Sequence, residues 1–282
     1  MARRINVAGM VLVMVLASLV LGVSEGLSAD WPSVFKEAKA KYAKFEKEIK
    51  DMTIMQEMKM IISEKDKKEM TSKMKMLRKG EEFRMEIKMQ MPQTPEMPKG
   101  MGEMETVIIY NGEDMWMISS FLGKKKLSEK EAEQYQTEKN WWDLISEKAK
   151  IVGTEKVDKR ECYVVETEEE KEFPFTKIWL DKKSLNLIKG ERKEPKAETL
   201  LWVNSDFRKI KDDWEMPYKT EMYVDGKLTS TLVVNSIEVN KGLSDDLFDP
   251  DKVEVKKVDM QEMMKKMMQE EEEKEKKEKE DN

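Results

Sequence analysis

The sequence has no histidine and only one cysteine, Cys162, among its 282 residues. Without histidine the chain lacks the commonest general base, the commonest zinc ligand and the base of Ser-His and Cys-His nucleophile pairs. A single cysteine cannot form a disulfide within the chain. Cys162 lies in the alternating segment ECYVV, which predicts a buried and unreactive thiol. These absences favour a protein that is not an enzyme, and we expect no cofactor and no metal site.

The sequence also lacks any long region in which all the charges have the same sign. Charged residues make up 39% of the chain, with lysine and glutamate interleaved, and the formal net charge is −6. Residues 1–29 contain Arg3, Arg4 and Glu25, so the chain without them has 50 basic and 57 acidic residues and a net charge of −7. This pattern predicts a solvated surface and no nucleic-acid partner.

Only one long apolar run occurs, at residues 7–23. It follows a basic start and precedes the small residues Ser28 and Ala29, which is typical of a secretory signal peptide cleaved before Asp30. We therefore expect residues 1–29 to be a signal peptide and the mature protein to be periplasmic. The alternative is a retained membrane anchor, since the run approaches the shortest length that spans a bilayer.

The sequence is rich in methionine, with 25 residues. In residues 83–91, FRMEIKMQM, apolar and polar side chains alternate, which predicts a half-buried strand with one apolar face. Residues 70–77 precede this strand across a turn that contains Gly80, so the two segments are predicted to form a hairpin. Residues 52–62 alternate in the same way and are predicted to form a neighbouring strand.

The rest of the chain predicts an α+β fold built on a curved antiparallel sheet. Residues 31–52 carry apolar side chains at steps of three and four, which predicts an amphipathic helix, and Ser128 is expected to cap a second helix reaching toward residue 145. No helix is expected between the later strands, which excludes parallel βαβ units. The remaining predicted strands are 107–110, 115–121, 151–152, 161–165, 173–180, 185–189, 200–210, 214–224 and 227–239.

Three further segments are not predicted to belong to the sheet. Residues 91–102 contain three prolines and two glycines and are predicted to be a loop. Residues 258–270 are predicted to be a helix with one methionine stripe, because five methionines recur there at helical spacing. The last residues, 270–282, are almost all glutamate and lysine and are predicted to be a solvated tail.

Four segments, taken in order, resemble the LolA-like family of outer-membrane lipoprotein-sorting proteins. They are KGEEFRMEI at 79–87, IIYNGEDMWM at 108–117, KIWLDKKSLNLIKGE at 177–191, and 206–250, which ends in IEVNKGLSDDLFDP. The resemblance extends over most of the chain, from about Trp31 to Pro250.

The resemblance implies an incomplete β-barrel of the LolA/LolB type, with helices covering its concave side. Members of this family carry lipoproteins across the periplasm and hold the acyl chains in the resulting cavity. The implied organisation is a signal peptide at 1–29, a lipid-binding domain at 30–258, and a methionine-rich helix with a charged tail at 259–282. The implied partners of this monomer are lipoprotein acyl chains or phospholipid, an inner-membrane exporter and an outer-membrane acceptor.

The cavity wall of such a carrier must be apolar and deformable. Methionine meets both needs, because its side chain is unbranched and polarizable and adapts to varied partners. The alternative is that these methionines only fill an ordinary core. The resemblance also implies a functional arginine just before residues 83–91, for which Arg78, Lys79 and Arg84 are all candidates. The predicted wall residues are Met52, Ile54, Met58, Met60, Met74, Met76, Phe83, Met85, Ile87, Met89, Ile109 and Trp116.

Two other functions remain open from the sequence. The same fold could serve as an envelope sensor or adaptor that binds a protein partner. A third possibility is a Cu(I) carrier, since thioethers favour Cu(I) and residues 258–270 could gather several sulfur atoms. The same methionine spacing, however, is expected of any amphipathic helix that lies on a sheet.

Overall fold

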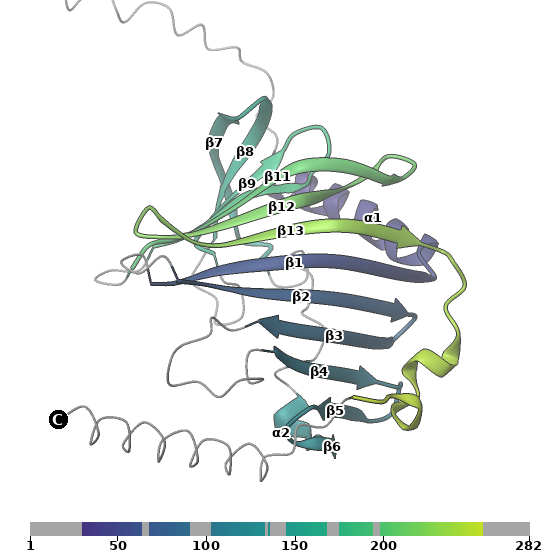
Figure 1. Ribbon diagram of the computed structural model, residues 1–282. Helices are drawn as coiled ribbons and strands as arrows, with labels where there is room; N and C mark the ends of the chain where they lie inside the picture. Colours follow the sequence, from purple (N-terminus) through teal and green to yellow (C-terminus); the bar gives the residue numbers. More distant parts are fainter. Residues whose placement is uncertain are drawn as a thin grey trace, which may run out of the picture.

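The computed structural model describes residues 30–63, 68–90, 103–132, 135, 145–167, 175–193 and 198–255, and its main feature is one antiparallel sheet of 13 strands (Figure 1). The first half contains α1 (Trp31–Glu48), β1 (Asp51–Ser63), β2 (Lys68–Lys79), β3 (Glu82–Gln90), β4 (Glu103–Tyr110), β5 (Met115–Ser119), β6 (Gly123–Lys126) and α2 (Glu129–Ala132). The second half contains β7 (Lys150–Val157), β8 (Arg160–Glu166), β9 (Lys177–Asp181), β10 (Leu187–Arg192), β11 (Leu200–Lys211), β12 (Trp214–Val224), β13 (Lys227–Val239) and the short 3₁₀ helices η2 (Asp245–Phe248) and η3 (Pro250–Lys252).

Two meanders are joined in this sheet by a pairing between its first and last strands. The order across the sheet is β6-β5-β4-β3-β2-β1-β13-β12-β11-β10-β9-β8-β7. β1 pairs with β2 on one side and with β13 on the other, both antiparallel. β6 and β7 lie at the two edges, so the sheet formed by the described strands stays open. The prediction of an open antiparallel sheet is therefore confirmed.

Tight turns that the sequence predicted connect several of the strands. Asp225 and Gly226, between β12 and β13, have φ angles of 48° and 76°. A two-residue type I′ turn, whose twist matches that of the hairpin strands, requires positive φ at both central residues. The strand predicted at 151–152 extends to Val157, and β6 is a strand that the sequence analysis did not predict.

Some predicted segments lie outside the described residues. They are the loop at 91–102, the methionine-rich helix at 258–270 and the charged tail that follows it. The helix predicted from Ser128 toward residue 145 is described as a helix only at α2, and residues 133–134 and 136–144 lie outside the description.

Helix α1 begins at a capped end and packs one apolar face on the sheet. The Asp30 carboxylate accepts a hydrogen bond from the backbone N–H of Ser33 at 2.8 Å, which satisfies one of the free donors at the helix start. The helix is shorter than predicted, because Ile49 is extended and the chain enters β1. Its buried side chains pack with residues of β8, β9 and the turn after β9 in one cluster: Trp31, Val34, Phe35, Ala38, Tyr42, Val165, Ile178, Leu180 and Leu185.

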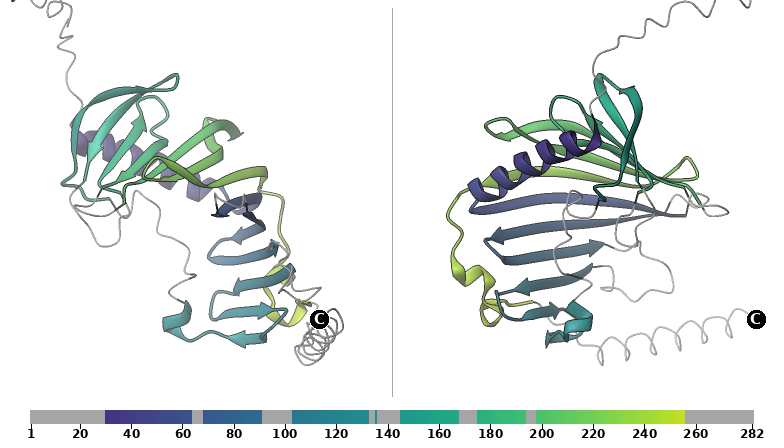
Figure 2. Two further views of the ribbon diagram at one scale, coloured as in Figure 1. Left: turned by 60° about the vertical axis from the view of Figure 1, so that its left-hand side comes forward. Right: turned by 180° about the vertical axis from the view of Figure 1, so that it is seen from behind.

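The curved sheet carries different segments on its two faces (Figure 2). We call the side that carries α1 and α2 the inner face, and the side that carries η2 and η3 the outer face. On the inner face, Ala132 of α2 packs with Phe83 and Ile108. On the outer face, Phe248 of η2 packs with Leu77 of β2, together with Val107, Ile109 and Ile118.

The described helices contact the inner face only near its two ends. α1 packs over the strands of the second meander and α2 over β3 to β5 (Figure 2). Helical cover over the whole concave side, which the resemblance implied, is not seen among the described residues. No helix in this part of the chain is long and apolar enough to cross a membrane.

We expect Phe248→Ala to destabilise the protein strongly. Phe248 is 1% exposed and central to the outer-face cluster. Deleting a buried aromatic ring costs about 3–5 kcal/mol, because apolar contacts are lost and a cavity remains. Urea denaturation should show this loss, whereas Leu122→Ala, at a side chain that is 73% exposed, should change the free energy of unfolding by less than about 0.5 kcal/mol. Equal effects of the two substitutions would contradict the anchoring role of Phe248.

Candidate functional site

Ten of the twelve predicted wall residues lie on the inner face, on three adjacent strands. Residues directly opposite one another in an antiparallel pair point to the same face. Ile54 of β1 lies opposite Met76 of β2, which in turn lies opposite Met85 of β3. The ten residues that share this face are Met52, Ile54, Met58, Met60, Met74, Met76, Phe83, Met85, Ile87 and Met89.

The other two predicted wall residues, Ile109 and Trp116, lie on the outer face. Ile109 of β4 lies opposite Arg84 of β3 and opposite Trp116 of β5. The inner-face position on β4 is its neighbour Ile108, which lies opposite Met85. Ile109 is 0% exposed and belongs to the cluster around Phe248. Grouping these two residues with the inner wall was wrong, because 107–110 is a continuous apolar run in which alternation does not distinguish the faces.

Part of this methionine-rich surface is accessible. Met60 is 36% exposed and Met76 is 38% exposed. The outer face of the same strands is charged instead, with ion pairs between Arg84 and Glu86 at 2.8 Å and between Lys88 and Glu105 at 3.1 Å. The sheet is therefore amphipathic at its centre, and its apolar side is the one that faces α1 and α2.

A pocket of about 290 Å³ lies between α1 and the sheet, at one end of the inner face. Met52 and Met216 line it and also pack against the cluster formed by Ile54, Tyr218 and Val234. This shared lining makes the pocket continuous with the methionine-rich surface. Its aromatic wall comes from the helix and the sheet together, because the Phe45 ring stacks on the Trp214 ring at 3.8 Å between centroids.

Polar groups meet at the helix side of this pocket. The Lys41 ammonium donates to the backbone carbonyl of Ser184 and to Asn186 Oδ1, the latter at 3.3 Å. Desolvation lowers the pKa of Lys41, and the nearby carboxylates of Glu215 and Asp181 oppose this shift. In this part of the structure Asn186 Nδ2 and Trp214 Nε1 are buried and have no hydrogen-bond partner. Leaving such a donor unsatisfied costs about 1–3 kcal/mol.

The structure separates the three candidates for the functional arginine. Arg84 donates to the backbone carbonyl of Leu247 at 3.0 Å, and Lys79 forms an ion pair with Asp245, so both hold the outer-face segment. Arg78 lies opposite Met52 and Phe83 on the inner face and lines the pocket under α1. Only Arg78 of the three therefore faces the candidate site.

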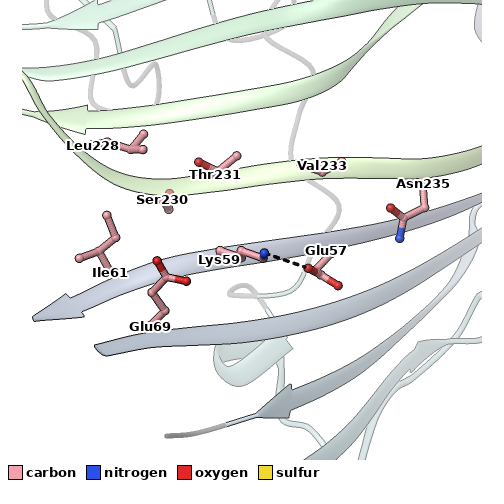
Figure 3. A pocket seen from close by; sticks show the side chains of 9 residues that line it. All are labelled: Glu57, Lys59, Ile61, Glu69, Leu228, Ser230, Thr231, Val233 and Asn235. Carbon is pink, nitrogen blue, oxygen red and sulfur yellow. Dashed lines mark ion pairs between the residues drawn. The ribbon is translucent and has the colours of Figure 1, made fainter. Parts of the chain in front are cut away.

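A second hollow, of about 320 Å³, lies on the opposite side of the sheet at β1 and β13 (Figure 3). Its lining mixes apolar side chains such as Ile61 and Leu228 with an ion pair between Lys59 and Glu57 at 3.9 Å. Neither this hollow nor the pocket under α1 could be predicted from the sequence, because both depend on the pairing of distant segments. The charged lining distinguishes the outer hollow from the methionine-rich inner face.

Solved structures of known proteins resemble this chain in fold. A family model described only as an uncharacterized protein matches residues 143–255. No curated protein matches the sequence. A DUF1329 family protein from Desulfovibrio piger is 16% identical, with a TM-score of 0.55 and coverage of 80% of this chain and 100% of that chain. This likeness shows a shared fold.

Two further solved structures carry the description that the sequence motifs had suggested. A LolA superfamily protein from Nitrosomonas europaea is 16% identical over 80% of this chain and 100% of its own, with a TM-score of 0.49. A putative outer membrane lipoprotein-sorting protein domain from Vibrio parahaemolyticus is 16% identical over 75% of this chain and 96% of its own, with a TM-score of 0.46.

Cys162 should be unreactive in the folded protein. It is 0% exposed, and burial raises its pKa from 9.0 to about 11. Because the thiolate is the reactive form, we expect native protein to react very slowly with Ellman's reagent at pH 8 and denatured protein to react at once. The raised pKa also means that stability falls as the pH rises from about 9 toward about 11. Rapid labelling of native protein would show that the thiol is accessible.

Proposed function

We propose that this protein binds the acyl chains of lipoproteins or other lipids on its inner face, performs no covalent chemistry, and carries this cargo across the periplasm toward the outer membrane. The observation that supports the proposal best is the set of ten apolar residues on one face of β1, β2 and β3, which is interrupted there by Gln56, Ser72 and Arg78. The ten residues share one face, and Met60 and Met76 remain more than one third exposed. Exposed, contiguous apolar surface is typical of binding sites.

The physical chemistry of the inner face suits a hydrocarbon chain. Each methylene group moved from water to an apolar surface contributes about 0.8 kcal/mol, so a long chain can bind without directional contacts. Methionine side chains can repack around chains of different length, because the thioether side chain has several rotatable bonds. Buried clusters also occupy parts of the inner face, around Phe83 and around Ile54. The part of this face that remains accessible for a ligand among the described residues lies around Met60 and Met76.

The N-terminal sequence and the resemblance to lipoprotein-sorting proteins support a periplasmic setting. Residues 1–29, which lie outside the described part, have the pattern of a cleaved signal peptide. We infer a periplasmic protein that receives its cargo from an inner-membrane exporter and passes it to an outer-membrane acceptor.

A matched pair of glutamate substitutions tests the proposed face. Met76 on the inner face and Met55 on the outer face are 38% and 40% exposed, on neighbouring strands. We expect Met76→Glu to weaken binding of a fluorescent alkyl probe at least tenfold, because a carboxylate would lie in the apolar path of the chain. Met55→Glu should bind as wild type, and both variants should retain the wild-type circular dichroism spectrum. If only Met55→Glu weakens binding, the cargo lies on the outer face.

Native mass spectrometry of protein purified from cells provides an independent test. Bound phospholipid or acylated peptide is the expected result. A protein that is always empty would favour the adaptor hypothesis, and a copper-dependent mass shift would favour the Cu(I) carrier.

A further inference from the structure

Two buried hydrogen-bond donors without partners line the pocket under α1. Asn186 is 4% exposed, and its Nδ2 group has no partner in the described structure. The indole Nε1 of Trp214 is also buried and without a partner. Both residues line the same pocket. Buried donors are almost always hydrogen-bonded in folded proteins, so two unsatisfied donors at one pocket indicate a site for a hydrogen-bond acceptor.

The orientation of the Asn186 amide is determined by its neighbours. Lys41 Nζ lies 3.3 Å from Oδ1, and an ammonium can only donate, so the oxygen must face Lys41 and the NH₂ group must point elsewhere. Asn204 provides a contrast in the same pocket. Its Nδ2 donates to the backbone carbonyl of Leu187 at 2.9 Å, and its Oδ1 accepts from Thr220 at 2.8 Å. Within this pocket the missing partner is therefore specific to Asn186 and Trp214, whereas Trp116 Nε1, which is also buried without a partner, lies on the outer face.

The pocket offers donors and little free acceptor capacity. Arg78 adds its guanidinium to the amide and indole N–H groups. Two carboxylates also line the pocket. Glu215 is paired with Arg160 Nη2 at 3.3 Å, and Glu46 is not free either. Because carboxylates stand near the cation, the pocket suits an uncharged acceptor better than a free anion.

We propose that the pocket under α1 is a subsite for the ester carbonyl oxygens of a glycerol-linked lipid, whose acyl chains extend onto the methionine-rich inner face. Asn186 Nδ2 and Trp214 Nε1 donate to these oxygens, and Arg78 lies at the rim next to Met52. The volume of about 290 Å³ suits the ester-bearing end of a lipid rather than whole chains. This proposal rests on the proposed function, because it assigns the polar end of the same ligand.

Competition against N-phenyl-1-naphthylamine, an apolar fluorescent probe, tests the subsite. Hexadecane carries no acceptor oxygen, dioleoylglycerol adds the ester carbonyls, and dioleoylphosphatidylglycerol adds a phosphate. Asn186→Asp removes the NH₂ donor but keeps an oxygen for Lys41, and Trp214→Phe removes the indole N–H but keeps a ring to stack on Phe45. Asn235→Asp in the outer hollow of Figure 3 is the matched control for charge and size.

We expect Asn186→Asp and Trp214→Phe each to weaken dioleoylglycerol binding about tenfold, as the loss of one buried hydrogen bond predicts. Hexadecane binding should not change, and Asn235→Asp should bind every ligand as wild type. A loss confined to dioleoylphosphatidylglycerol would overturn the ester assignment in favour of the phosphate, and inorganic phosphate should then compete.

Wild-type affinity for dioleoylglycerol in both variants would overturn the subsite, and so would an equal loss of hexadecane binding, which would report a change in pocket shape alone. If wild-type protein binds neither hexadecane nor dioleoylglycerol, the proposed function itself fails. Binding of hexadecane with no preference for the ester would overturn the subsite and leave acyl-chain binding intact.

Discussion

The pairing of β1 with β13 is the constraint on which the rest of this structure depends. All other strand pairings join neighbours in the chain, whereas this one brings Met52 opposite Val239 and Met60 opposite Ser230. Side-chain hydrogen bonds hold its end, because the Asp51 carboxylate accepts from the backbone N–H groups of Lys241 and Gly242 at 2.7 and 2.9 Å. Without this pairing β1 would be a sheet edge, and the methionine-rich strands would not be continuous with the wall under α1.

The two faces of the joined sheet have separate physical tasks. The outer face is closed over β2 to β5 by the segment that contains Phe248, which buries branched and aromatic side chains with well-defined packing. The inner face is packed at its ends by α1 and α2 and remains partly exposed between them. A core built mainly of methionine would be packed with little specificity, because the side chain is flexible. The same flexibility is useful on the exposed part of the inner face, where the surface must adapt to a ligand.

Local patterns predicted most strands and most of the inner face, because hairpins depend on residues close in the chain. The alternation in 83–91 and the turn at Gly80 determined which side chains of β2 and β3 point together. The same reasoning misplaced Ile109, since 107–110 is apolar on both sides and both sides prove to be covered. Residues 243–255 carried no signal for the outer face that they cover, because no local pattern specifies where a segment of short 3₁₀ helices and extended chain will dock.

The sequence by itself therefore determined the antiparallel hairpins, the amphipathic helix and the apolar, methionine-rich character of one strand face, all of which follow from side-chain spacing and turn chemistry. Only the tertiary structure decided which face is concave, which of Arg78, Lys79 and Arg84 reaches it, and where the donors of Asn186 and Trp214 meet. These features arise where α1, β1 and β12 come together. Their physical basis is contact between segments far apart in the chain, which short-range periodicity does not encode.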